Sequence, residues 1–386
     1  MFSAVAKDDY MKRFFMFALF IAVLSLMPAM AYNETETRRV VIDGVTVDAT
    51  SVNAEMLPLR DIIEHIGGTV SWDNSRRRIT IAVGNRTIAA AVNNPHVSVN
   101  RSTVEAEIPL QIIDGRAAVT LCFLADILGM GTGYKNNTFF LSATPASEIP
   151  VVTYHHILPD ELNTHFYDNI WTVSAENFAM QMRYLYENGF YTPTLCELEA
   201  FIFHGRLLPQ NSVMIHFDDG YYSNYVFAYP ILQRYGLRAV LFPITAEAEA
   251  LGEYQPEFNR RILQWSAAST LRTGMDVWET ASHTHNLHGL ALDDKSTLLV
   301  TASREEIVED ILRSFYFLTN HRAFAYPLGQ FNNTVIEALR EAGITMAFTV
   351  RNGYITRRSN PMLLPRFMIY NSTPLEGFMK IVNRRA

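Results

Sequence analysis

The sequence predicts an α/β protein: a larger C-terminal part built around a parallel sheet, preceded by a small α+β repeat domain. Two patterns in the 386 residues support this prediction. Residues 149 to 386 alternate short apolar runs with amphipathic stretches, which is the arrangement of βα units. Residues 38 to 143 carry two copies of one motif, which indicates a repeated supersecondary unit. The polar segment from 144 to 149 contains a proline and is the expected domain boundary.

The first 31 residues read as a secretory signal peptide. The pair Lys12-Arg13 precedes an apolar run from 14 to 26, and residues 29 to 31, Ala-Met-Ala, fit a cleavage site. The first ten residues look like an upstream extension, so Met11 is the expected start. The apolar run is short for a membrane span, and the alternative is an uncleaved N-terminal anchor. In either case we expect a protein that is secreted or attached to the cell envelope.

Composition excludes two further classes. The formal net charge is -7 and no basic cluster occurs, so no nucleic-acid partner is expected. The two cysteines, Cys122 and Cys196, fall in different predicted domains, which excludes a disulfide framework and leaves a single cross-domain bond without support. A hydrophobic fraction of 49% is ample for packed cores.

The N-terminal repeat recurs at an offset of 62 residues, from 57 to 119. Each copy reads as a short amphipathic helix, a glycine that ends it, and a strand or hairpin. Trp72 of the first copy corresponds to Tyr134 of the second. These two aromatic residues either stack on sugar or pack within the hairpins, and packing is the commoner use of equivalent repeat positions.

This segment resembles the domain named after the N-terminus of copper amine oxidase. The resemblance carries no copper chemistry, because the histidines of the segment, His65 and His96, are isolated. We expect a spacer or a module that binds the cell wall.

The C-terminal elements follow from apolar periodicity and glycine stops. Strands are expected at 150–156, 213–217, 239–243, 278–282, 324–326 and 346–350, and helices at 178–188, 195–203, 225–235, 303–318 and 333–342. The acidic stretch from Glu247 to Asn259 is interpreted as a plain solvated connection rather than a lid.

The run VMIHFDDG, from Val213 to Gly220, carries the strongest chemical signal. Its apolar part has the length and β-branched content of a buried strand. Asp218 and Asp219 follow where that strand would end, and reactive side chains gather at the carboxyl ends of parallel strands. Adjacent carboxylates favour a nearby cation. We interpret the pair as part of a divalent metal site, and the alternative is an Asp-Asp-Gly turn.

The run HTHNLH follows a short predicted strand that ends at Ser282. His283 and His288 do not share a face at helical spacing, but from a strand end and its loop both can point at one ion. Two imidazoles and one carboxylate leave a position for water, which suits catalytic zinc. His285 is an alternative ligand, and the remaining interpretation is three surface histidines.

Together these runs resemble the polysaccharide deacetylase family, metal-dependent carbohydrate esterases with a NodB-like domain. HFDDG resembles the first family motif, SHTHNLH the second, and FAYPLG, from Phe324 to Gly329, the third. The resemblance covers about residues 149 to 382, and three motifs in order are a specific signal. It implies a distorted (β/α) barrel of about seven strands and a hydrolase acting on the carbon–nitrogen bond of linear amides.

The resemblance also implies roles for individual residues. Asp219, His283 and His288 hold a divalent metal, expected to be zinc, and Asp218 is the general base. A bound ion activates water and polarises the carbonyl, while the base takes the proton from that water. The backbone amide at Leu328 is the expected oxyanion donor.

Three features depart from the family pattern. Ala325 stands where many members have the arginine that steadies the base, and Arg366 is the candidate replacement. Leu328 stands where tyrosine is usual. The C-terminal Leu-x-His that supplies the acid is absent, but one subgroup looks circularly permuted, with its acid in an N-terminal Tyr-His. Tyr154-His155 matches that pattern, so His155 is the acid candidate unless it is a structural residue at a strand end.

The family implies an N-acetylated sugar polymer such as peptidoglycan, poly-N-acetylglucosamine or chitin, or in some branches O-acetylated xylan. A wall-type module on an extracellular enzyme favours an envelope polymer. Tyr222, Tyr326 and Pro327 are the substrate-binding candidates, because aromatic faces near motif ends can stack on sugar rings. Such side chains also pack in cores.

Two functions of different class remain open. The first is a deacetylase of envelope polysaccharide, and the second is a non-catalytic wall- or carbohydrate-binding protein that retains the fold. The departures favour the second, and the intact Asp218 favours the first because a binding protein needs no base. A third possibility is a purely structural metal site, which requires a fourth protein ligand such as His285.

Overall fold

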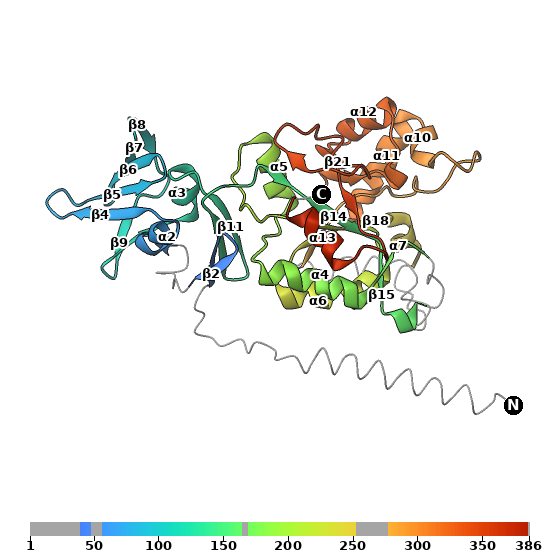
Figure 1. Cartoon of the computed structure of the whole chain (residues 1–386). Coiled ribbons are helices and arrows are strands. Elements are labelled where there is room, and N and C mark those ends of the chain that lie inside the picture. The colour runs from blue at the N-terminus through green and yellow to red at the C-terminus, as the bar shows by residue number, and fades with distance from the viewer. Residues whose placement is uncertain (1–38, 48–55, 164–168, 252–276, 385–386) are drawn as a thin grey trace. The chain divides into compact units, whose positions relative to one another are not determined.

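The computed structural model describes residues 39–47, 56–163, 169–251 and 277–384, and Figure 1 shows their path. The predicted signal peptide lies outside the described residues, as does the part of the acidic stretch beyond residue 251. In the described ranges no helix has the length and apolarity needed to cross a membrane.

The N-terminal segment is rich in antiparallel strands. Its elements are β1 (Arg39–Ile42), β2 (Val45–Val47), β3 (Leu57–Pro58), α2 (Leu59–His65), β4 (Thr69–Asp73), β5 (Arg78–Val83), β6 (Arg86–Ala91), β7 (His96–Val99), β8 (Ser102–Glu105), β9 (Gln111–Ile113), β10 (Arg116–Val119), α3 (Leu121–Asp126), β11 (Gly131–Lys135) and β12 (Thr138–Ser142). Strands β4 to β8 form one five-stranded sheet in chain order, with β4 at its edge.

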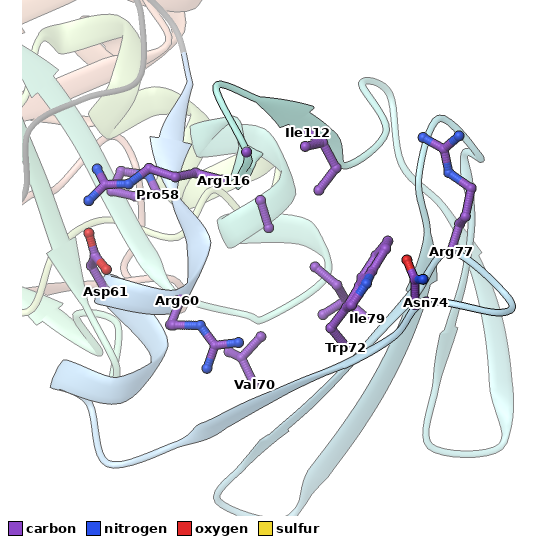
Figure 2. A pocket seen from close by; sticks show the side chains of 12 residues that line it. Pro58, Arg60, Asp61, Val70, Trp72, Asn74, Arg77, Ile79, Ile112 and Arg116 are labelled. Carbon is purple, nitrogen blue, oxygen red and sulfur yellow. The ribbon is translucent and has the colours of Figure 1, made fainter.

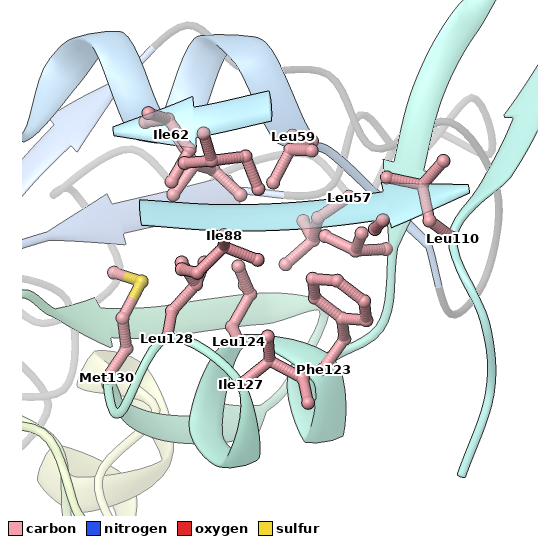
Figure 3. Packing of buried hydrophobic residues seen from close by; sticks show 14 of the residues in the cluster. Leu57, Leu59, Ile62, Ile88, Leu110, Phe123, Leu124, Ile127, Leu128 and Met130 are labelled. Atoms are coloured by element: carbon pink, nitrogen blue, oxygen red, sulfur yellow. The ribbon is translucent and has the colours of Figure 1, made fainter. Parts of the chain in front are cut away.

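The predicted repeat is confirmed as strand, helix, strand: β3-α2-β4 and β10-α3-β11. Thr120 begins α3 by accepting a hydrogen bond from the Phe123 amide, 3.2 Å. Apolar side chains of both copies enter one core, in which Leu59 and Ile62 from α2 and Phe123 from α3 are at most 2% exposed. Figure 3 shows these side chains packed around Ile88 of β6. Neither short helix would be stable alone, so this shared burial stabilises the repeat.

The C-terminal segment alternates strands and helices. Its elements are β13 (Glu148–Ile149), β14 (Val151–Tyr154), β15 (His156–Leu158), β16 (Thr172–Ser174), α4 (Ala175–Glu187), α5 (Leu195–Phe203), β17 (Met214–Asp219), η2 (Asn224–Ala228), α6 (Tyr229–Tyr235), β18 (Ala239–Pro243), α7 (Thr245–Leu251), β19 (Trp278–Thr280), α10 (Leu298–Thr301), α11 (Arg304–Ser314), η3 (Phe315–Phe317), β20 (Ala323–Ala325), η4 (Pro327–Gly329), α12 (Asn333–Glu341), β21 (Met346–Phe348), β22 (Ile355–Thr356), β23 (Phe367–Met368) and α13 (Leu375–Val382).

Parallel pairings connect seven of these strands. A five-stranded sheet has the order β19-β18-β17-β14-β23. A single parallel bridge between Ser282 and Phe324 continues it from β19 to β20, which pairs with β21. A second bridge joins Phe348 of β21 to Leu364, three residues before β23. Ladders and single bridges thus connect seven strands in series, in agreement with the α/β class that was expected.

Most predicted elements are confirmed, with three corrections. The predicted helix at 225–235 begins as a π-helical turn, η2, before α6 ends at Gly236 with a left-handed φ of 61°. The predicted helix at 303–318 ends at Ser314 and continues as a 3₁₀ turn. Residues 247–251, expected in a connection, belong to α7. Cys122 and Cys196 are free, so the cross-domain bond does not form.

Candidate active site and metal centre

The two acidic residues of the first motif lie at the carboxyl end of β17, as expected. This strand is buried along its whole length and pairs with β14 and β18, so its end opens at the edge where neighbouring strands also end. Asp219 adopts a φ of 70°, which L-residues with side chains rarely occupy. Regular extended backbone would point adjacent carboxylates to opposite faces. The break at Asp219 lets two neighbouring carboxylates make two different sets of contacts.

Asp219 lies beside both histidines of the second motif. Its Oδ1 atom is 3.5 Å from His283 Nε2 and 3.4 Å from His288 Nε2. Ligands about 2.1 Å from a tetrahedral ion lie about 3.4 Å from one another, so these separations fit one central ion. Among the described residues these three form the group of potential ligands, with all ligand atoms within 4.8 Å of one another. One carboxylate and two imidazoles suit a divalent cation such as zinc and leave a coordination position open.

Hydrogen bonding orients His283 for this position. Its Nδ1 atom donates to the Ala325 carbonyl oxygen, 2.8 Å away. A carbonyl oxygen accepts only, so the proton is on Nδ1 and the Nε2 lone pair faces Asp219. Burial opposes a charge on this ring, but a second proton on Nε2 would be hydrogen-bonded by Asp219, and this bond and the nearby carboxylates raise the pKa of His283.

His285 does not join the cluster. Its Nδ1 atom is 3.0 Å from Thr245 Oγ1, and its Nε2 atom is 3.4 Å from Glu249 Oε2, both on α7. The fourth ligand that a purely structural site would need is therefore not supplied by His285. The described residues offer three protein ligands, the number typical of a catalytic ion.

Asp218 instead pairs with Arg366, which lies two residues after Leu364. Both carboxylate oxygens accept from the guanidinium, Oδ1 from Nη1 and Oδ2 from Nη2, each at 2.8 Å. The Nε atom of Arg366 donates to the Thr349 carbonyl oxygen, 3.0 Å away, which fixes the fork. Burial alone would raise the pKa of Asp218, but Arg366 outweighs it and holds that pKa below its ordinary value. Arg366 thus supplies a guanidinium group beside Asp218, which the alanine at position 325 cannot supply.

His155 follows β14 and lies near the same charges. Its ring packs at 4.7 Å from that of Trp171, and its buried Nδ1 has no hydrogen-bond partner among the described residues. Burial lowers the pKa of His155, while Asp219 and Asp218 act in the opposite direction. His156 differs in kind, because its Nδ1 is 3.0 Å from Ser223 Oγ and its ring stacks on Tyr221. Burial lowers the pKa of His156 to about 4.

The third motif forms a tight turn after β20. Leu328 has a φ of 51° and a side chain that is 55% exposed, so the position depends on its backbone. The amide of Leu328 has no backbone acceptor outside its own turn among the described residues. Strained backbone at Asp219, Thr284 and Leu328 thus occurs in all three motifs, as is common at functional sites.

The structure corrects the predicted aromatic subsites. Tyr326 is 0% exposed, and its hydroxyl donates to the Met362 carbonyl oxygen at 3.0 Å. Its ring belongs to the hydrophobic core and does not present a face to a sugar. Pro327 is also buried, and Tyr222 is 9% exposed with its ring against that of Tyr225. The aromatic side chains next to the motifs mainly support the turns.

Three further residues support the site. Asp310 of α11 accepts hydrogen bonds from the amides of His285 and Asn286, at 2.7 and 2.6 Å, and so fixes the histidine loop. Burial raises the pKa of Asp310 to about 6. Tyr221 hydrogen-bonds Asp219, and Trp171 packs on His155. Asp310 and Trp171 reach the site from other elements, so spacing along the chain does not reveal them, whereas Tyr221 directly follows the Asp-Asp-Gly motif.

The fold places two adjacent acids at the carboxyl end of a buried parallel strand, beside two histidines, which is an arrangement typical of a hydrolytic enzyme. The family model for polysaccharide deacetylases matches residues 206–347, and that for the copper amine oxidase N-terminal domain matches residues 42–141. A poly-beta-1,6-N-acetyl-D-glucosamine N-deacetylase from Staphylococcus aureus is 31% identical over 204 residues, 52% of this chain and 68% of that protein. The Staphylococcus epidermidis protein of the same name is 30% identical over 207 residues, which are 52% of this chain and 69% of that protein.

Solved structures show the same fold. IcaB from Ammonifex degensii is 24% identical, with a TM-score of 0.51 over 63% of this chain and 99% of that chain. A de-N-acetylase from Aggregatibacter actinomycetemcomitans is 23% identical, with a TM-score of 0.52 over 61% of this chain and 99% of that chain. The chain belongs to the polysaccharide deacetylase family, and it is an enzyme of that family.

Proposed function

We propose that this enzyme is metal-dependent and removes N-acetyl groups from an extracellular amino-sugar polymer of the poly-N-acetylglucosamine or peptidoglycan type. The observation that carries the proposal is the contrast between two adjacent carboxylates. Asp219 joins two histidines in a three-ligand cluster, while Asp218 is held by Arg366. The pair thus separates the two tasks of amide hydrolysis, holding a cation and accepting a proton.

In this mechanism Asp219, His283 and His288 would hold the divalent ion, for which zinc fits the donor set. The ion would supply polarisation of the acetyl carbonyl and a lower pKa for the attacking water. Asp218 accepts the proton of that water, and Arg366 keeps Asp218 ionised and fixed in direction. The Leu328 amide donates to the developing oxyanion.

The leaving amine needs a proton before the carbon–nitrogen bond breaks. We assign this step to His155, whose ring packs against Trp171 and whose pKa responds to both Asp218 and Asp219. Proton transfer from His155 releases a free amine on the polymer and acetate. His156 is the weaker candidate, because Ser223 and the ring of Tyr221 already hold it.

The relatives support an amino-sugar polymer as substrate, because the Staphylococcus proteins are named for poly-beta-1,6-N-acetyl-D-glucosamine. Such a polymer lies outside the cytoplasm, which agrees with the predicted signal peptide. We further propose that the N-terminal segment attaches the enzyme to the cell envelope. The non-catalytic alternative rested on two departures from the family pattern, the missing arginine at Ala325 and the missing C-terminal histidine. The first is weakened, because Arg366 lies beside Asp218.

Comparison of polymers tests this proposal. Purified protein without its first 31 residues, loaded with zinc or cobalt, is incubated with oligomers of β-1,6-linked N-acetylglucosamine, of chitin and of peptidoglycan, and free amine is measured. We expect the β-1,6-linked oligomer to react fastest, and Asp218→Asn to abolish release. Fastest release from peptidoglycan would instead select that polymer. No amine from any of them, with the ion bound, would contradict the proposal.

A further inference from the structure

A groove in the N-terminal segment does not coincide with the acid–histidine cluster. It has a volume of about 630 Å³ and lies between β4, α2 and the β9–β10 hairpin. Figure 2 shows the Trp72 ring rising from β4, with Arg60 and Arg116 across the groove from Arg77. Buried Val70 and Ile79 form an apolar floor, and Ile112 faces the indole. The groove therefore combines a flat aromatic face with several guanidinium groups.

Trp72 is an unusual residue to leave uncovered. It is 42% exposed on an edge strand, opposite Ile79 of β5, and within the described part of the chain its indole has no hydrogen bond or aromatic neighbour. The equivalent residue of the second repeat, Tyr134, is 38% exposed but has side-chain partners. Its hydroxyl donates to Asn137 Oδ1 at 2.9 Å, and its ring packs 4.9 Å from that of Phe139. The two repeats thus use the same position differently.

The charge around Trp72 is positive, although the whole protein carries -7. Arg60 already pairs with Glu64 at 2.9 Å. Arg77 and Arg116 are exposed and have no ion pair with any described residue, and Asp61 is the one carboxylate in the lining. The lining therefore contains two guanidinium groups without an ion-pair partner among the described residues and a single carboxylate. Guanidinium forks bind carboxylates in a bidentate manner, and aromatic faces stack on flat apolar surfaces such as sugar rings.

We propose that this groove binds an acidic glycan whose sugar rings carry carboxylates, a polyuronate. The ring face of the glycan packs on Trp72, its carboxylates pair with Arg77 and Arg116, and Asn74 and Asp61 bond its hydroxyls. A deacetylated glucosamine polymer carries free ammonium groups, which the arginines repel. The groove therefore selects a polymer other than the product of the catalytic site. Such binding would hold the enzyme on an acidic matrix, whatever its deacetylase substrate.

Electrophoresis of the native protein through gels containing polygalacturonate tests the proposal. The gels are run at about 0.15 M salt, because interactions between exposed charges more than about 8 Å apart are then screened. Three other gels separate the contribution of ring stacking from that of charge. Dextran has sugar rings without charge, poly-glutamate has carboxylates without sugar rings, and chitosan has sugar rings with positive charge. We expect retardation by polygalacturonate alone. Trp72→Ala and the double variant Arg77→Gln/Arg116→Gln should each weaken retardation roughly tenfold, about 1.4 kcal/mol. Trp72→Phe, which keeps an aromatic face, should lose less.

The matched control is Arg101→Gln, which removes one exposed positive charge from the β7–β8 turn outside the groove. It should bind polygalacturonate like the parent protein. All variants should release amine from a soluble N-acetylglucosamine oligomer at the parent rate, which shows that they fold and separates this test from that of the catalytic site. Equal retardation by poly-glutamate, retardation by chitosan, or unchanged binding by Trp72→Ala would overturn the proposal.

Discussion

Asp218 and Arg366 are 148 residues apart in the sequence, yet they form a bidentate ion pair with both distances at 2.8 Å. Asp218 is 3% exposed and Arg366 is 0% exposed. Two charges so deeply buried are stable only when each satisfies the other, and Arg366 is further fixed by the Thr349 carbonyl oxygen. The pair joins the proposed base, at the carboxyl end of β17, to an arginine that directly precedes β23.

Replacing Arg366 by methionine should damage stability and activity together. The variant leaves Asp218 buried without a cation, which costs about 3–5 kcal/mol of unfolding free energy. The double variant Asp218→Asn/Arg366→Met should regain much of that loss, because no buried charge remains. Urea unfolding at pH 7 measures both, and equal stabilities of the two variants would contradict a stabilising ion pair.

The same variant should change the pH dependence. In the parent protein the pKa of Asp218 lies below 3.8, so its stabilising contribution is present above that value and is lost as the pH falls through the lowered pKa. Without Arg366, burial raises this pKa instead. The stability difference between parent and Arg366→Met should therefore shrink on acidification through pH 4. Any residual activity of the variant should show its acid limb at higher pH than that of the parent.

His155→Asn should separate amide from ester hydrolysis. A general acid contributes about 10²- to 10⁴-fold when the leaving group needs a proton. We expect amine release from N-acetylglucosamine oligomers to fall by that factor, while hydrolysis of 4-nitrophenyl acetate, whose leaving group departs without a proton, falls far less. Bound metal, measured in the same samples, should be unchanged. Equal losses on both substrates would assign His155 a structural role.

Gly220 should be intolerant of any side chain. Its φ is +83°, and an added Cβ atom would lie 2.6 Å from Pro243 Cβ and 2.9 Å from Pro243 Cα. Positive φ and overpacking together predict a loss of about 2–4 kcal/mol for Gly220→Ala, with weaker metal binding as Asp219 shifts. Gly343→Ala is the matched control, since its φ is +93° but nothing lies within 4 Å of an added Cβ. Chemical unfolding measures the loss of unfolding free energy in both variants. The difference between the two losses gives the contribution of the clash with Pro243, apart from the cost of a side chain at positive φ.

Much of this architecture was predictable because local signals and the fold agree. Helix α5 follows its predicted bounds, and the structure adds a capping box formed by Thr194 and Glu197 at its start. The acid pair could be placed at a strand end because β17 is apolar before it. The candidate metal ligands could be grouped because strand ends of a parallel sheet converge on one edge.

What escaped prediction depends on contacts between distant segments. Asp310 fixes the histidine loop from α11, and nothing in its own helix distinguishes it from a solvated acid. Tyr326 looked like a sugar-stacking residue because it adjoins the third motif, but its hydroxyl finds an acceptor at Met362 and its ring is buried. Side-chain direction at a turn depends on its φ and ψ angles, which residue types alone do not specify. The substitute role of Arg366 was a guess from sequence for the same reason.

The most direct measurement of the central claim combines metal content with amine release in three proteins. The parent, Asp218→Asn and Asp219→Asn are stripped with a chelator, and zinc is then added back in steps while binding and release from an N-acetylglucosamine oligomer are followed. The account predicts that the parent binds one ion and regains activity in proportion. Asp218→Asn should bind the ion and stay inactive, and Asp219→Asn should bind it at least about tenfold more weakly. Full activity of the stripped parent, or metal binding unaffected by Asp219→Asn, would contradict the division of roles between the two adjacent acids.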